Sequence, residues 1–150
     1  MQTKNETLIC LADGHQGRLI LCDISSEGRC KPTELGRYRR KDVEPGDRNA
    51  GPGRRRATRE RFDSAQSERN RRHAKGVMAW MSDRIRRHGT RQVLLMAGPR
   101  LLSNLGRYCP ARLRGRIRTV PCDLAHLDAT SVTAHPAVRQ AIGLQTPKRP

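Results

Sequence analysis

Aromatic residues are scarce in this chain. They make up 3% of its 150 residues, and the four of them are Tyr38, Phe62, Trp80 and Tyr108. Proteins that hold single-stranded nucleic acid by base stacking place aromatic side chains among basic ones. No such interleaved run is present. Base stacking is therefore excluded as the main mode of any nucleic-acid binding, which would read backbone and shape instead.

Long apolar runs are also missing. The apolar stretch nearest the start, residues 8–12, has only five residues and follows no basic leader. A transmembrane helix needs about 20 apolar residues. We therefore expect neither a signal peptide nor a membrane span.

The cysteines lack the spacing of a metal site. There are five of them, at positions 10, 22, 30, 109 and 122, and no two form a CxxC pair. Structural zinc sites draw on such pairs, so no metal is expected. Cys10, Cys22 and Cys122 lie in strand-like runs, which predicts buried, reduced thiols and a cytoplasmic protein.

Motifs of cofactor-dependent and hydrolytic enzymes are absent as well. The segment "GPGRRR" at 51–56 lacks the Gly-Lys-Ser/Thr end of a phosphate-binding loop. No GxGxxG is present, and no Gly-x-Ser-x-Gly elbow that would carry a nucleophilic serine. We expect a protein without a cofactor and without enzymatic activity.

Positive charge is the most prominent property of the sequence. Lys and Arg number 31 against 14 Asp and Glu, which gives a net charge of +17. Residues 29–118 hold 26 of the basic and 8 of the acidic residues, so they carry +18 and the rest carries −1. A solvated, solubilising surface is one explanation. Polyanionic partners such as RNA, the ribosome, DNA or an acidic surface are the other, because self-repulsion at this charge favours a compensating partner.

The first forty residues predict strands. Apolar runs at 8–12 and 19–22 flank a short polar link, which indicates a β-hairpin. Asp13, Gly14 and Gly17 are the expected turn residues, with glycine supplying a positive φ. A third, charged strand over 34–40 is expected at the edge of the sheet.

Residues 41–61 predict a loop, since they contain Pro45, Gly46 and the "GPG" of 51–53 without apolar periodicity. A helix follows from about 64 to 87, with Asp63 as N-cap and Gln66 completing a capping box. Its first half has little apolar character, so it projects from the core or lies along a partner. Its predicted core face consists of Ala74, Val77, Met78, Met81 and Ile85.

The remaining third alternates between strands and helices. "QVLLMAG" at 92–98 predicts a buried strand, and the following segment a helix with Leu101, Leu102 and Leu105 inward. "IRTVPCDL" predicts a strand, and 131–144 a short last helix. The sequence thus predicts one α/β domain over 1–143 with a tail at 144–150. Its mixed sheet would begin as an antiparallel hairpin or meander and continue through βαβ crossovers, with helices packed on it.

Four segments in this order resemble the bacterial host attachment family. They are "LADGHQGRL", the phenylalanine before the long helix, "VLLMAGPRLLSNLG" and "CDLAHLD". The family has Ala-Pro-Pro where this chain has Ala97-Gly98-Pro99, and a threonine where it has Ala125. The resemblance covers residues 8 to about 142.

That family is distantly similar to the middle domain of eukaryotic and archaeal peptide-chain release factors and of Pelota. The resemblance implies a ribonuclease H-like sheet and a tip before the long helix that faces ribosomal RNA. In release factors that tip carries Gly-Gly-Gln. Here the same place reads "AGPGRRRATRERF", without the glutamine or the glycine pair. Release activity is therefore not carried over, and any role in attachment would be indirect, through translation of adhesion factors.

Arginines before and within the start of the long helix are the best candidates for binding RNA phosphates. The set comprises Arg54, Arg55, Arg56, Arg59 and Arg61, extended by Lys41, Arg48, Arg69, Arg71 and Arg72. A charged loop without a partner is the simpler alternative.

Two other functions stay open. One is an adaptor that binds an acidic protein or surface. The other is a metal-dependent nuclease that uses Asp13 and Asp123, with Asp23 and Asp128 nearby in sequence. The simpler role of Asp13 and Asp123 is to form turns.

Overall fold

A five-stranded mixed sheet forms the centre of the protein. The structure is a computed structural model and describes residues 6–40, 55–88 and 92–143. The strands are β1 (Glu6–Ala12), β2 (Gln16–Ile24), β3 (Cys30–Arg39), β4 (Gln92–Ala97) and β5 (Ile117–Pro121), in the spatial order β3-β2-β1-β4-β5. Strands β1, β2 and β3 pair antiparallel, while β4 runs parallel to both β1 and β5. This confirms the predicted mixed sheet and places β3 at an edge.

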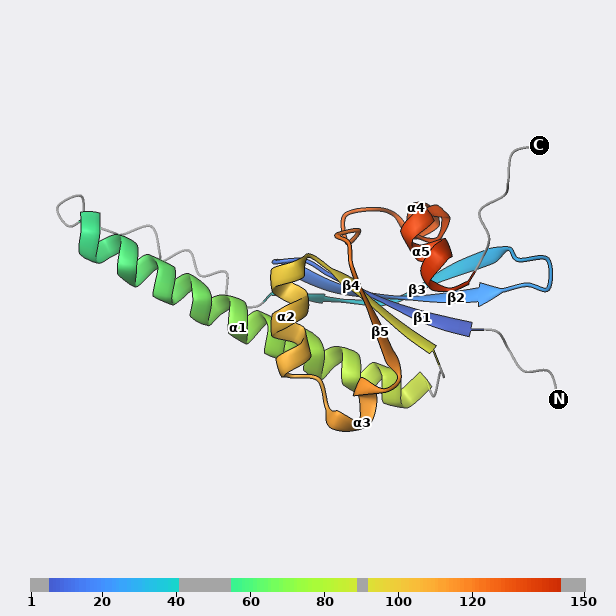
Figure 1. Ribbon diagram of the computed structural model, residues 1–150, viewed down its shortest axis with the longest axis horizontal. Helices are drawn as coiled ribbons and strands as arrows, with labels where there is room; N and C mark the ends of the chain where they lie inside the picture. The colour runs from blue at the N-terminus through green and yellow to red at the C-terminus, as the bar shows by residue number, and fades with distance from the viewer. Residues whose placement is uncertain (1–5, 41–54, 89–91, 144–150) are drawn as a thin grey trace.

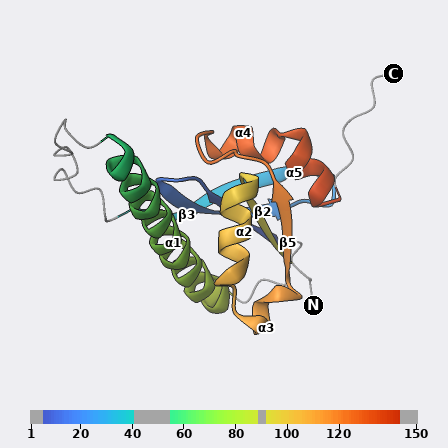
Figure 2. The same ribbon diagram turned by 60° about the vertical axis from the view of Figure 1, so that its left-hand side comes forward.

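Helices cover both faces of this sheet (Figure 1). They are α1 (Arg55–His88), α2 (Pro99–Arg107), α3 (Ala111–Arg114), α4 (Ala129–Ala134) and α5 (Pro136–Ala141). Helices α1, α2 and α3 lie on one face and α4 and α5 on the other, as the turned view in Figure 2 shows. None of the described helices is long and apolar enough to cross a membrane.

The inner strands are apolar on both faces because each face is covered by helices. In β1, Leu8 and Cys10 point into the core under α1 and α2, and Ile9 and Leu11 into the core under α4 and α5. The strand β4 alternates in the same way, and Val93–Ala97 is buried throughout. The predicted buried strand at 92–98 is confirmed.

The hairpin is confirmed, but its turn works differently from the prediction. Among the described residues only Gly28 and Gly143 have a positive φ, so Gly14 and Gly17 do not supply one. Instead, the Asp13 carboxylate accepts hydrogen bonds from the backbone N–H groups of His15 and Gln16, at 2.7 and 2.9 Å. An aspartate that bonds the backbone two residues on forms such a turn without glycine.

Gly17 lies in strand β2, beneath α1. A Cβ atom at this position would lie 3.1 Å from Val77 Cγ1. A second close approach occurs where α1 crosses β3, since a Cβ at Gly76 would lie 2.2 Å from Tyr38 Oη. These glycines lack a side chain because the long helix packs tightly against the sheet.

Helix α1 begins at Arg55, earlier than predicted. Residues 55–61 are therefore helical and not loop, and Asp63 lies inside the helix and is not its N-cap. Gln66 donates to Asn70 along the helix instead of closing a capping box. Arginine, alanine and glutamate all have high helix propensity, which outweighs the turn signal of the preceding glycines and proline. The rest of the predicted loop, residues 41–54, lies outside the described residues.

The second half of α1 packs as predicted. Its five predicted core residues, Ala74, Val77, Met78, Met81 and Ile85, are all buried, and the helix ends at His88. In α2, Leu105 is buried while Leu101 and Leu102 are half-buried against the same core.

The last predicted helix is two helices, α4 and α5. Pro136 has no N–H to continue α4 and instead starts α5, with the His135 side chain accepting from Ala137 N. The short helix α3 was not predicted from the sequence.

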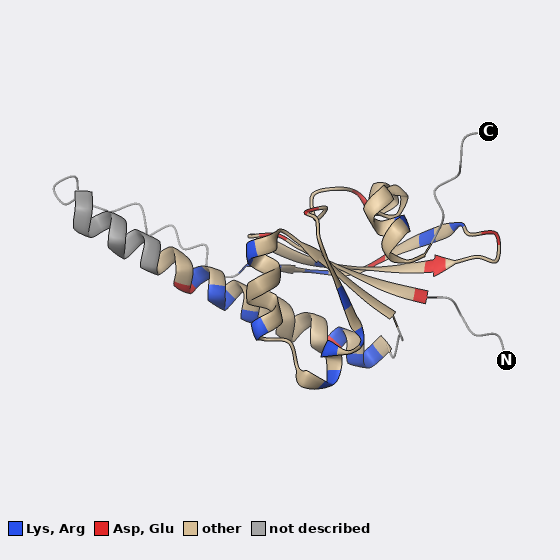
Figure 3. Ribbon diagram, viewed as in Figure 1, with Lys and Arg blue, Asp and Glu red and all other residues tan. Residues whose placement is uncertain are grey.

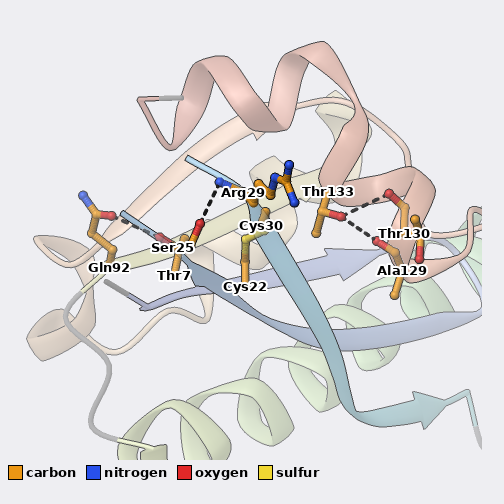
Figure 4. Close-up of a disulfide and its surroundings, with 9 residues drawn as sticks. All are labelled: Thr7, Cys22, Ser25, Arg29, Cys30, Gln92, Ala129, Thr130 and Thr133. Atoms are coloured by element: carbon orange, nitrogen blue, oxygen red, sulfur yellow. Dashed lines mark hydrogen bonds between the residues drawn. A yellow bond between two sulfur atoms is a disulfide. The ribbon is translucent and has the colours of Figure 1, made fainter. Parts of the chain in front are cut away.

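Cys22 of β2 and Cys30 of β3 form a disulfide, shown in Figure 4. The prediction of a reduced thiol is therefore wrong for Cys22. The pairing follows from strand register, because Ile24 lies opposite Cys30 and places Cys22 diagonally across the ladder. Cys10 and Cys122 are free, and burial raises the pKa of the Cys10 thiol well above its ordinary range.

The buried side chain of Arg18 connects the segment after β5 to the sheet through hydrogen bonds. Arg18 is 1% exposed, and its guanidinium makes two 2.8 Å hydrogen bonds to the Glu34 carboxylate. The same group donates to the carbonyl oxygen of Ala125 at 2.9 Å and to that of Leu127. One side chain thus links the neighbouring strands β2 and β3 to a segment more than 100 residues further along the chain.

Candidate nucleic-acid interface

Many Lys and Arg residues lie along α1, α2 and α3, which cover one face of the sheet (Figure 3). Beyond the α1 arginines already named, that face carries Lys75, Arg84, Arg100, Arg107, Arg112 and Arg114. The segment from residue 122 to 143, which includes α4 and α5 on the opposite face, has Arg139 as its only Lys or Arg, alongside Asp123 and Asp128, although Arg118 of β5 also donates to Ala141 O on that side. The molecule is therefore electrostatically two-sided, and the α1–α2–α3 face is the one suited to a polyanion.

Helix α1 extends beyond the sheet at its start (Figure 1). Its 34 residues make it about 50 Å long at 1.5 Å per residue. The first buried residue with a described side chain is His73, and none of residues 65–72 is buried. Among the described side chains, the buried part of α1 therefore begins at His73, and residues 65–72 are exposed or half-exposed. The extension of α1 beyond the sheet agrees with the prediction that its first half projects from the core.

The predicted arginines fall into three groups. Lys41, Arg48 and Arg54 lie outside the described residues. The main chain of Arg55, Arg56, Arg59 and Arg61 forms the first turns of α1. Arg69, Arg71 and Arg72 follow on the same helix, half-exposed or exposed. The structure thus places seven of the ten predicted residues on one helix.

A cleft of about 370 Å³ lies between α1 and α2, where α1 leaves the sheet. It is lined by Ser67, Asn70 and Arg71 of α1 and by Arg100, Ser103, Asn104 and Arg107 of α2. All seven side chains are polar, three are arginines, and none is a carboxylate. Such a lining suits an anionic ligand with oxygen acceptors.

The cleft arginines differ from their neighbours in their ion pairing. Arg72 pairs with Glu68 at 3.6 Å, and Arg86 and Arg87 pair with Asp83 at 3.0 and 3.2 Å. Within the described ranges, Arg71, Arg100 and Arg107 pair with no carboxylate. Their guanidinium groups are therefore available to an external anion.

Sequence analysis found Arg71 and missed Arg100 and Arg107. These two arginines lie about thirty positions further along the chain, so no local charge run connects them with Arg71. A usable signal existed in α2, where 100, 103, 104 and 107 follow the i, i+3, i+4, i+7 spacing of one helix face. Only the packing of α2 beside α1 brings the two polar faces together.

The two aspartates considered for a nuclease centre are engaged in turns. Asp13 holds the β1–β2 turn, and Asp123 accepts a hydrogen bond from Ala125 N at 3.4 Å. Asp128 caps α4 by accepting from Ser131 N, and the hydrogen bond from the Ser131 hydroxyl, with a smaller contribution from this N–H, lowers the pKa of the Asp128 carboxyl. Over the described part of the chain, no three His, Cys, Asp or Glu side chains gather where a metal ion could be held.

The fold and the cleft define an α/β protein with one mixed sheet between two helical layers and one strongly basic face. The chain belongs to the family of proteins required for attachment to host cells, whose family model matches residues 10–135. This confirms the family expected from the four sequence segments. No curated protein matches the sequence.

Proposed function

We propose that the protein binds structured RNA, ribosomal RNA in the first place, through the basic face of α1, α2 and α3. The observation that carries this proposal is the α1–α2 cleft, whose three arginines have no described carboxylate partner. Arginine guanidinium groups form forked hydrogen bonds with phosphate oxygens, and the release of counterions from RNA favours binding.

We also propose that the fold is ribonuclease H-like, which the arrangement of strands supports. An antiparallel meander of three strands is followed by two parallel strands reached through helices. The resemblance to release-factor middle domains implies an RNA-facing tip before the long helix. In this chain that position corresponds to the projecting start of α1, which carries Arg55, Arg56, Arg59 and Arg61.

We propose that the protein is not an enzyme and that its role in attachment is indirect. Binding to the ribosome would alter translation of factors that act at the cell surface. Such a role implies a cytoplasmic location. That location predicts that Cys22 and Cys30, which form a disulfide in the structure, are reduced in the cell, because disulfides persist mainly in oxidising compartments.

Cosedimentation with ribosomes tests the proposal. Wild type is compared at low and high salt with a variant in which Arg54, Arg55 and Arg56 are alanine. A second variant with lysine at the three positions keeps the charge and removes the guanidinium forks. We expect wild type to travel with a subunit at low salt and the alanine variant to stay at the top of the gradient. Wild type that stays at the top at low salt would contradict the ribosomal assignment.

The two alternative functions have their own outcomes. An adaptor would retain a specific protein partner in a pull-down after nuclease treatment. A nuclease would cleave RNA in the presence of Mg²⁺ and lose that activity in Asp13→Asn. Neither result is expected.

A further inference from the structure

We propose that the α1–α2 cleft is a distinct binding site for consecutive phosphodiester groups of one RNA strand. This inference rests on the proposed function and goes further. It assigns strand contact to Arg71, Arg100 and Arg107 rather than to the basic face as a whole.

The geometry of the cleft fits a strand. On α2 the lining residues run from Arg100 to Arg107, which spans about 10 Å at 1.5 Å per residue. On α1 the lining residues Ser67, Asn70 and Arg71 share one helix face, since positions three and four apart lie on the same side. The cleft thus has arginines at both ends of its α2 wall and a third arginine, Arg71, on its α1 wall.

The lining chemistry fits the backbone of a nucleic acid. Contacts to phosphate and sugar come from Arg together with neutral Ser and Asn side chains. Here Asn70, Asn104, Ser67 and Ser103 lie among the three arginines. The neutral groups can donate to phosphate oxygens and also accept from a ribose 2′-hydroxyl, which an all-arginine surface could not do.

The same lining disfavours a protein occupant. Protein interfaces depend on a few buried apolar or aromatic anchors that fill pockets. The cleft has no apolar or aromatic lining residue, so such an anchor would find no apolar surface there. The chemistry therefore favours a ligand that binds through phosphates.

Two charge-matched double variants test the inference. Arg100→Ala/Arg107→Ala removes two cleft arginines. Arg112→Ala/Arg114→Ala removes two exposed arginines from α3 on the same face, outside the cleft. All four side chains are exposed, so both variants should keep the wild-type melting temperature. The measurement is the affinity for a fluorescent RNA hairpin with a single-stranded uridine extension, at one fixed salt concentration.

We expect the cleft variant to lose at least about tenfold more affinity than the α3 variant, since only its arginines would form charge-assisted hydrogen bonds with the bound phosphates. Equal losses of affinity in the two variants would show that the cleft is not the site of strand contact, while the proposed RNA binding by the basic face would stand. Failure of wild type to bind the RNA at low salt would overturn both proposals.

A second measurement locates the strand directly. Uridine tetranucleotide is titrated into the ¹⁵N-labelled protein while the arginine Nε–Hε resonances are followed. Resonances of Arg71, Arg100 and Arg107 should shift, and those of Arg112 and Arg114 should not. Pentaglutamate is added in a parallel titration. If pentaglutamate shifts the cleft resonances as much as the tetranucleotide does, the cleft is not a site for phosphodiester groups.

Discussion

At the scale of single residues, Arg18 is the most consequential side chain in the sheet. It is buried and bonded to Glu34 and to the carbonyl oxygens of Ala125 and Leu127. Arg18→Met should lower the free energy of unfolding by about 3 kcal/mol, because it leaves these acceptors without their donor. Urea unfolding measures this loss. The control is Arg37→Met, which removes the exposed second partner of Glu34 and should cost less than about 1 kcal/mol. Equal costs would contradict the role assigned to Arg18.

Glu34 gives the same ion pair a pH dependence. The hydrogen bond from Arg18, with further contributions from the Arg18 charge and from Arg37, lowers the pKa of the Glu34 carboxyl in the folded protein. The unfolded chain therefore takes up the proton first, and stability falls as the pH drops below about 5. Glu34→Gln should be less stable at neutral pH and should lose less stability between pH 6 and pH 3. If the variant lost as much stability as wild type between pH 6 and pH 3, Glu34 would not contribute to the pH dependence of stability.

At the scale of elements, the packing of α1 on the sheet depends on Gly76. A Cβ there would lie 2.2 Å from the Tyr38 hydroxyl oxygen and 3.0 Å from Tyr38 Cζ. Gly76→Ala should destabilise the protein by about 1–3 kcal/mol despite the better helix propensity of alanine, because the ring must move. Gly106→Ala in α2 is the control, since nothing lies within 4 Å of its Cβ position. That variant should gain up to about 1 kcal/mol in thermal unfolding. A stabilising Gly76→Ala would show that Tyr38 does not confine α1.

Elements with a strong apolar pattern were predictable from the sequence. The hairpin, β4 and the packed half of α1 bury their apolar residues on the expected faces, so local periodicity sufficed. The start of α1 was not predictable in this way, because Asp63 looks like an N-cap and the arginines before it follow turn-forming residues. The disulfide was missed because it depends on the register of β2 and β3, which no local pattern fixes.

At the scale of the whole molecule, the site depends on which helix faces meet. Charge alone indicated a polyanionic partner, and it led to the arginines closest together in sequence. The cleft adds Arg100 and Arg107, which reach Arg71 only because α2 packs beside α1. Long-range packing of this kind is absent from the sequence pattern, and it turns a general positive charge into a site with a defined lining.

Phosphate binding by the basic face of α1, α2 and α3 is the basis of the proposed function. The most direct test is the affinity of the wild-type protein for a structured RNA across a series of salt concentrations. Each neutralised phosphate contributes roughly 0.7–0.9 to the slope of log K against log salt. The cleft and the start of α1 together should neutralise at least about four phosphates, so we predict a slope of about −3 or steeper. Binding that is absent at low salt, or that does not change with salt, would contradict the account.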